Sequence, residues 1–210
     1  MIFGTVLLSV AAVVCVPTAP AAPLGLVADT VSREALYAQG ETFDSFFSHA
    51  EARREMWVTN FERGAAPAEL VQRAQGVPGT WRLLVITIDG CSDSANTLPY
   101  LPHLVDAVPN LEMRIIDSDV GRVVMDAHRT PDGRPATPTM VLLNDRFEEV
   151  GCFIERPEAL QTWALGEGSE LNPREFLDAK FAWYDADAGR QTMSAIVELM
   201  EGAVGGAIGC

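Results

Sequence analysis

The chain has 210 residues, 48 % of them hydrophobic and 21 % charged, which is enough apolar sequence for one domain with a full core. Its 29 acidic side chains outnumber the 15 basic ones and give a net charge of −14. So acidic a surface repels nucleic acid and anionic lipid, and neither is expected as a partner.

The first 23 residues differ from the rest of the chain. Residues 1–16 are almost wholly apolar and uncharged, and residues 17–23 are small and proline-rich. This order, with Ala-Pro-Ala at 19–21, is typical of a secretory leader with its cleavage site, although the usual basic residues at the start are missing. We expect export to the periplasm or the cell exterior. Two alternatives stay open: an uncleaved anchor, which would bring the chain to a membrane, and a cytoplasmic protein.

Helical patterns fill residues 30–79, which we interpret as an N-terminal helical extension. Thr42 offers an N-cap to the longest of these helices, and Gly64 offers a stop. Aromatic residues recur at helical spacing between them and predict packing positions. The predicted helices are 32–38, 43–63 and one from Pro67 to Gly76.

The pattern changes at Trp81. Residues 82–88 (RLLVITI) form a run of leucine and β-branched residues, as in a strand buried on both faces. The expected order after this strand is a polar turn at 89–93, a helix at 94–108, a strand at 111–116, a helix at 119–127, a loop at 129–134, strands at 139–143 and 148–154 joined at Asn144-Asp145, and a helix at 157–165. One or two further helices reach Glu201, before a glycine-rich tail.

This order of elements predicts an α/β fold. A strand–helix–strand unit requires parallel strands with a right-handed crossover, whereas the tight turn at 144–145 requires an antiparallel pair. A mixed four-stranded sheet flanked by helices satisfies both. We expect the core domain at 80–165, C-terminal helices at 166–201 and a flexible tail at 202–210.

The segment 88–99 carries the motif that is most informative about function. It resembles the active-site turn of thioredoxin-like proteins, in which a strand ends in an acidic residue followed by Trp-Cys-Gly-Asp and by a helix containing a proline. Cys91, Asp93 and Pro99 match this pattern. The resemblance implies a thioredoxin fold with Cys91 as its redox centre.

Other landmarks of that family follow at the expected places. Residues 137–141 (TPTMV) resemble the loop before the third strand, with Pro138 as the cis-proline. Gly151 and Arg156-Pro157 resemble the family's ending, and residues 43–63 resemble its N-terminal extension. The resemblance covers most of residues 41–157.

Two departures from the family pattern change the expected chemistry. Gly90 stands where the family usually has tryptophan, and Ser94 stands where dithiol members have their resolving cysteine. The resulting C-x-x-S motif removes the ordinary cycle, in which the second cysteine attacks the mixed disulfide. The resemblance then implies a monothiol site, with Cys91, Asp93 and Ser94 as the catalytic set. Gly90, Thr137 and Pro138 are the expected substrate contacts.

The reactivity of Cys91 depends on its surroundings. A cysteine at a helix N-terminus faces unpaired N–H groups and the positive end of the helix dipole, and both favour the reactive thiolate. The negative charge of Asp93 opposes it, and Asp93 is equally interpretable as a plain helix N-terminal carboxylate. A reactive thiol and an inert thiol at a cap therefore both remain open.

The remaining cysteines and the three histidines are scattered, without the spacing of a metal motif, so we expect no metal and no cofactor. Cys152, on the last strand, is interpreted as a small buried hydrophobe. Cys210 ends the glycine-rich tail, whose reach of about 15–18 Å makes it a candidate resolving thiol for Cys91. The alternative is a frayed end without a role.

These observations lead to one functional prediction with two rivals. We expect a thioredoxin-like monothiol protein that exchanges thiols and disulfides with a protein or small-molecule substrate. The first rival is a catalytically inactive module that holds an extended peptide at the Pro138 face. The second is a structural or assembly protein, linked through Cys210 or held by its leader.

Overall fold

Four strands form the central sheet of this computed structural model, which describes residues 1, 32–207 and 209–210. The strands are β1 (Trp81–Thr87), β2 (Leu111–Asp117), β3 (Thr139–Leu143) and β4 (Glu149–Ile154), and they lie side by side in the order β2-β1-β3-β4. β1 pairs parallel with β2 and antiparallel with β3, and β3 pairs antiparallel with β4. The predicted mixed four-stranded sheet is confirmed.

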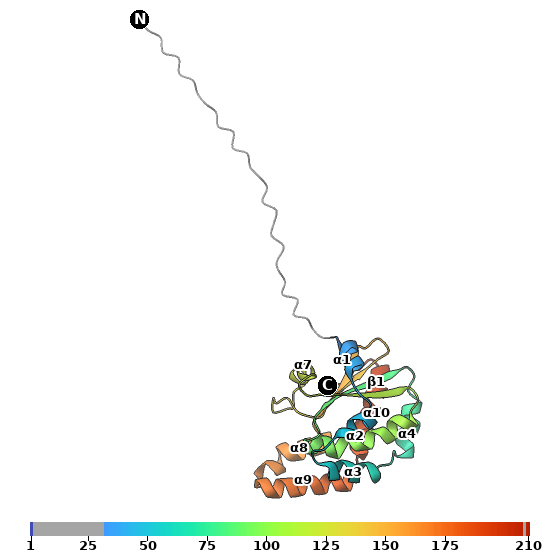
Figure 1. Ribbon diagram of the computed structural model, residues 1–210, viewed down its shortest axis with the longest axis vertical. Helices are drawn as coiled ribbons and strands as arrows, with labels where there is room; N and C mark the ends of the chain where they lie inside the picture. Colours follow the sequence, from blue (N-terminus) through green and yellow to red (C-terminus); the bar gives the residue numbers. More distant parts are fainter. Residues whose placement is uncertain (2–31, 208) are drawn as a thin grey trace. The chain divides into compact units, whose positions relative to one another are not determined.

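The helices precede, connect and follow these strands (Figure 1). They are α1 (Arg33–Gln39), α2 (Phe43–His49), α3 (Arg54–Glu62), α4 (Ala68–Gln75), α5 (Ser92–Thr97), α6 (Leu101–Ala107), α7 (Arg122–Ala127), α8 (Glu158–Leu165), α9 (Pro173–Asp187) and α10 (Arg190–Val204), with short 3₁₀ helices η1 (Leu98–Tyr100) and η2 (Glu167–Glu170). The leader predicted at residues 1–23 lies, apart from Met1, outside the described part. No helix in the described part is long and apolar enough to cross a bilayer.

Helices cover both faces of the sheet. One face packs against α2 to α6 and α10, in a core that contains the fully buried Trp57 and Leu83. The other face packs against α1 and α7, around Leu84 and Ile86. Successive residues of β1 thus enter opposite cores, which explains why its sequence is apolar throughout.

The predicted single helix at 43–63 is wrong, because the chain turns between α2 and α3. Arg53 has a left-handed backbone, with φ 55°. The carboxylate of Asp89, from the turn after β1, accepts hydrogen bonds from the backbone N–H groups of Glu51 and Ala52, at 2.9 and 2.8 Å. These donors are therefore satisfied by a distant carboxylate instead of by helical carbonyls.

Two other predicted helices are shorter or divided. The segment predicted as one helix at 94–108 contains α5, η1 and α6, and Pro99 lies in the 3₁₀ turn between the two α-helices. The helix predicted at 119–127 begins only at Arg122, because Asp117 accepts the backbone N–H of Asp119 and holds a turn there.

The C-terminal segment forms two long helices and then returns to the sheet. α9 and α10 are joined at Ala188-Gly189, both with a left-handed backbone. A side chain on Gly189 would meet the ring of Tyr100 at 2.1 Å, so this position requires glycine. Beyond α10, the carbonyl oxygen of Gly209 accepts the N–H of Cys152 at 2.7 Å. The tail, expected to be free, is thus fastened to the edge of β4.

We predict that Asp89→Ala loosens the α2–α3 turn. The loss of two hydrogen bonds to this half-buried carboxylate is expected to lower the free energy of unfolding by about 1–2 kcal/mol and to speed proteolysis near residue 52. Urea denaturation and limited proteolysis measure both effects. Asp178→Ala, which removes an exposed carboxylate with one long ion pair, is the control. Equal stability of the two variants would contradict the role of Asp89.

Candidate active site

Cys91 occupies the N-cap of α5, directly after the turn that follows β1. It is half-buried, and it is the one free cysteine in the described part of the chain. Its Sγ atom lies 3.0 Å from the carbonyl oxygen of Thr137 and 3.5 Å from the N–H of Ser94. The peptide bond between Thr137 and Pro138 is cis. The structure thus brings the predicted thiol and the predicted loop into direct contact, although they lie 46 residues apart.

The two residues of this loop are exposed differently. Thr137 is half-buried, whereas Pro138 is buried. The loop is held from the far side, because the carbonyl oxygen of Pro138 accepts the N–H of Glu155 at 2.7 Å. Thr137 is therefore the more exposed of the two residues beside Cys91.

Ser94 lies beneath the thiol and is fully buried. Its Oγ accepts a hydrogen bond from the hydroxyl of Thr87, at the end of β1, at 2.7 Å. The hydroxyl is thus engaged with the sheet and faces away from solvent. Among the predicted catalytic set, Ser94 is placed as a support for the first turn of α5.

Gly90 is flanked by the N-terminal extension. Its carbonyl oxygen accepts a hydrogen bond from Nε of Arg53 at 2.6 Å, and the carbonyl oxygen of Asp89 accepts one from the indole of Trp57 at 2.9 Å. A Cβ atom on Gly90 would meet only Ala52, at 3.8 Å, so space alone does not demand glycine here. The extension therefore supports the turn that carries Cys91.

Asp93 takes part in a buried group of charges. Its side chain is 10 % exposed, and Nζ of Lys180 lies 3.2 and 3.1 Å from its two oxygens. The hydroxyl of Tyr184 donates to Asp93 Oδ1 at 2.8 Å. Burial, and then the neighbouring carboxylate, hold the pKa of Tyr184 well above its usual value, so the phenol stays protonated as a donor.

Two further charges complete this group. Nε of Arg156 lies 3.8 Å from Asp93 Oδ1, and Nη2 of the same side chain lies 2.6 Å from Glu155. Asp93 and Glu155 are thus matched by Lys180 and Arg156, all of them nearly buried. The carboxylate of Asp93, on the same helix as the N-cap thiol of Cys91, is therefore not an uncompensated negative charge.

A groove lies one turn further along α5. It has a volume of about 510 Å³ and lies between α3, α5 and α9. Arg53, which binds the carbonyl of Gly90, forms one side, and Asn96 and Phe181 form others. The groove offers a mixed polar and apolar surface close to the turn of Cys91.

The family model described as thioredoxin matches residues 40–173. The chain belongs to the thioredoxin family. A protein of unknown function from Pseudomonas aeruginosa has a similar crystal structure, with a TM-score of 0.64 and 27 % identity over 82 % of this chain and 98 % of the other. An HIV epitope-scaffold is also similar, with a TM-score of 0.62 and 26 % identity over 81 % and 98 % of the two chains. No curated protein matches the chain.

In this thioredoxin-family chain, Cys210 is paired with Cys152 and not with Cys91. The two Cα atoms are 5.0 Å apart, and the sulfur atoms form a disulfide. This pairing corrects the interpretation of Cys152 as a free buried hydrophobe and of Cys210 as a resolving thiol. The physical reason is the backbone bond between Gly209 and Cys152, which fixes the tail at β4.

Sequence reasoning missed the residues of α9 that reach the site. Lys180 is the only lysine in the chain, but its rarity does not indicate where it lies in the fold. It lies 87 residues from Asp93, its main partner. Arg156 belongs to the matched family ending, yet nothing in its spacing linked it to Asp93.

We predict that Lys180→Met destabilises this domain strongly. Removing one partner of a buried ion pair leaves an uncompensated charge, which costs about 3–5 kcal/mol of unfolding free energy. Urea denaturation measures this loss, and Lys180→Met combined with Asp93→Asn is expected to recover part of it. Arg73→Met, which breaks the exposed pair with Glu201, serves as the control and should cost about 1 kcal/mol or less. Equal losses in the two single variants would refute the buried pair's contribution.

Proposed function

We propose that this protein carries out thiol–disulfide exchange with Cys91 as a single nucleophilic thiol. The observation that carries the proposal is the position of its sulfur: free, half-buried, at the N-cap of α5, and 3.0 Å from the carbonyl of Thr137. A disulfide approaching along the exposed side of Thr137 meets this sulfur directly. The family membership supports the same chemistry.

The proposed reaction has two steps. The Cys91 thiolate attacks one sulfur of the substrate disulfide, forming a mixed disulfide and releasing the other sulfur as a thiolate that takes up a proton. An external thiol then attacks the mixed disulfide, leaves with the substrate fragment as a new disulfide, and returns Cys91 to its thiolate form. Ser94 has no sulfur with which to perform this second attack.

The electrostatic surroundings support the first step. The thiolate is the attacking form of cysteine, and a nearby uncompensated carboxylate would disfavour it. The ion pairs of Asp93 with Lys180 and Arg156 remove this obstacle. The proposed substrates are disulfides of proteins or small molecules, and export by the predicted leader would place the protein where such disulfides persist.

A trapping experiment tests the proposal. Incubation of the purified chain with a small aromatic disulfide is expected to give one mixed disulfide at Cys91, identified by mass spectrometry, and an excess of small thiol should release it. Cys91→Ser should abolish the adduct. The matched control is the double variant Cys152→Ser/Cys210→Ser, which retains Cys91 and should react at the wild-type rate. A Cys91 that reacts no faster than free cysteine would support the peptide-binding alternative instead.

We predict that Ser94→Cys converts the site into a dithiol. The N–H of Ser94 is already 3.5 Å from Cys91 Sγ, and a thiol at this buried position is close enough to close a disulfide after modest rotation. The variant should reduce a protein disulfide without accumulating the mixed disulfide that the wild type forms. Ser92→Cys, at the adjacent position, is the control and should not do so. Persistent mixed disulfide in both variants would contradict the assigned role of position 94.

A further inference from the structure

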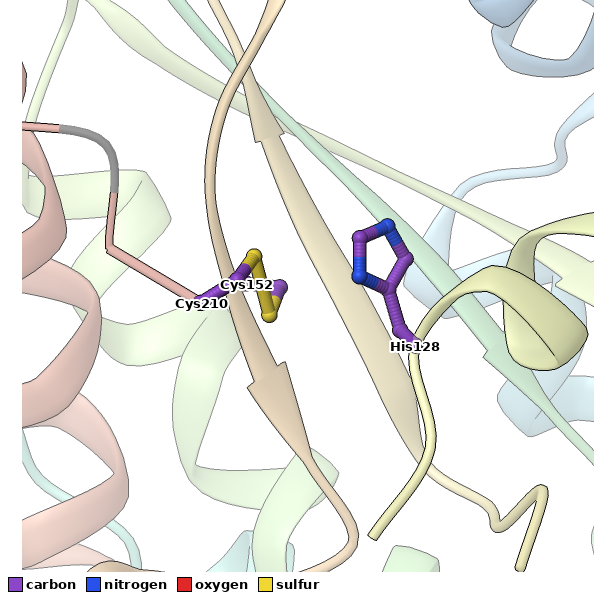
Figure 2. A group of neighbouring side chains, drawn as sticks. All are labelled: His128, Cys152 and Cys210. Carbon is purple, nitrogen blue, oxygen red and sulfur yellow. A yellow bond between two sulfur atoms is a disulfide. The ribbon is translucent and has the colours of Figure 1, made fainter. Parts of the chain in front are cut away.

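Three side chains with metal-binding atoms lie together on the far side of the sheet from α5. They are His128, Cys152 and Cys210, and one potential ligand atom from each lies within 4.8 Å of the others. Figure 2 shows the ring of His128 with one nitrogen turned toward the two sulfur atoms. His128 follows α7, Cys152 lies on β4 and Cys210 follows the glycine-rich tail, so three separate segments meet here.

The backbone holds the two cysteines together independently of their sulfur–sulfur bond. The N–H of Cys152 donates to the carbonyl of Gly209 at 2.7 Å, and the N–H of Gly209 donates to the carbonyl of Val150 at 3.4 Å. Cys152 is also paired with Val141 on β3. Because these bonds do not involve sulfur, they remain to keep the two thiols close after reduction.

His128 is oriented by a carboxylate. Its Nε2 lies 2.5 Å from Oε1 of Glu149, and both side chains are largely buried. Nε of Arg33 binds the other oxygen of the same carboxylate at 2.9 Å. A carboxylate on one ring nitrogen fixes the ring and leaves the other nitrogen as a ligand, an arrangement common around protein-bound zinc.

We propose that reduction of the Cys152–Cys210 disulfide converts this cluster into a Zn²⁺ site with two thiolates and one imidazole as its protein ligands. Sulfur and nitrogen are the ligands that zinc prefers, and three protein ligands leave one tetrahedral position for water or an external thiol. Both cysteines line a groove of about 780 Å³, through which the ion and that fourth ligand reach the site.

The electrons and protons of this conversion balance. Two molecules of an external thiol reduce the disulfide, giving two cysteine thiols and one external disulfide. Zn²⁺ then displaces one proton from each thiol as it binds. An external disulfide then oxidises the two thiolates: it takes up two electrons and two protons and leaves as two thiols, while the Cys152–Cys210 disulfide re-forms and the ion is released. The disulfide and the zinc site therefore exclude each other.

The site does not depend on Cys91 or on the function proposed for it. Cys152 packs against the core beneath α1 and α7, whereas α5 packs on the opposite core. Zinc binding is therefore measured in a Cys91→Ser chain, which removes the third described thiol.

The experiment compares the reduced and oxidised forms of this chain. After reduction with a phosphine and removal of excess reagent, one Zn²⁺ per chain is expected by mass-spectrometric metal analysis, and none after oxidation. Co²⁺ in place of zinc should show sulfur-to-cobalt charge-transfer absorption. Cys152→Ser should abolish that absorption. Glu149→Gln should weaken zinc binding about 10–100-fold, and His128→Gln at least as much.

The matched control is His49→Gln. His49 also binds a carboxylate, that of Glu41, at 2.9 Å, but it is exposed and, among the described residues, it belongs to no cluster with cysteines. This variant should bind zinc as tightly as the Cys91→Ser parent. The proposal is overturned if the reduced chain binds no zinc, or if His128→Gln binds it as tightly as His49→Gln. Circular dichroism of each variant establishes that the fold is retained.

Discussion

The buried carboxylate of Asp93 is the point on which the arrangement of the site depends. It lies in the first turn of α5, and its partners come from two other parts of the chain: Lys180 and Tyr184 from α9, and Arg156 from the segment after β4. A buried charge is tolerated only when it is paired and hydrogen-bonded. This requirement fastens the C-terminal helices to the helix that carries Cys91, and it removes a free negative charge from beside the sulfur.

The N-terminal extension fastens the same turn from the opposite direction. Asp89 binds the N–H groups between α2 and α3, and Arg53 and Trp57 bind the carbonyls of the turn itself. Elements that precede and follow the thioredoxin core in the sequence therefore both stabilise the short segment around Cys91. In the exchange that we propose, a thiol fixed in this way would meet its substrate with little loss of conformational freedom.

The cysteines of the described part of the chain lie in two separate places. Cys91 lies at the N-cap of α5, beside the Thr137 loop. Cys152 and Cys210 lie at the edge of β4, where they join the tail to the sheet. Under the function and the zinc site that we propose, an external thiol would release a bound substrate at Cys91, and it would open the disulfide between Cys152 and Cys210.

The sequence by itself determined the sheet and the position of Cys91 after its first strand, because long apolar runs and turn residues act locally along the chain. The contact of Cys91 with the Thr137 loop, 46 residues away, was expected only from the resemblance to thioredoxin-like proteins. The sequence did not determine the break at residues 50–53, because the cause is a carboxylate 37 residues further on. Nor did it determine the partners of Asp93 or of Cys210. No sequence pattern links Lys180 to Asp93 or Cys152 to Cys210. Only the packing of α9 and of the tail against the core brings these side chains together. The tendency to form a strand, a turn or a helix depends on neighbouring residues and can be predicted from them. The pairing of distant charges and sulfurs depends on how the helices and strands pack against one another.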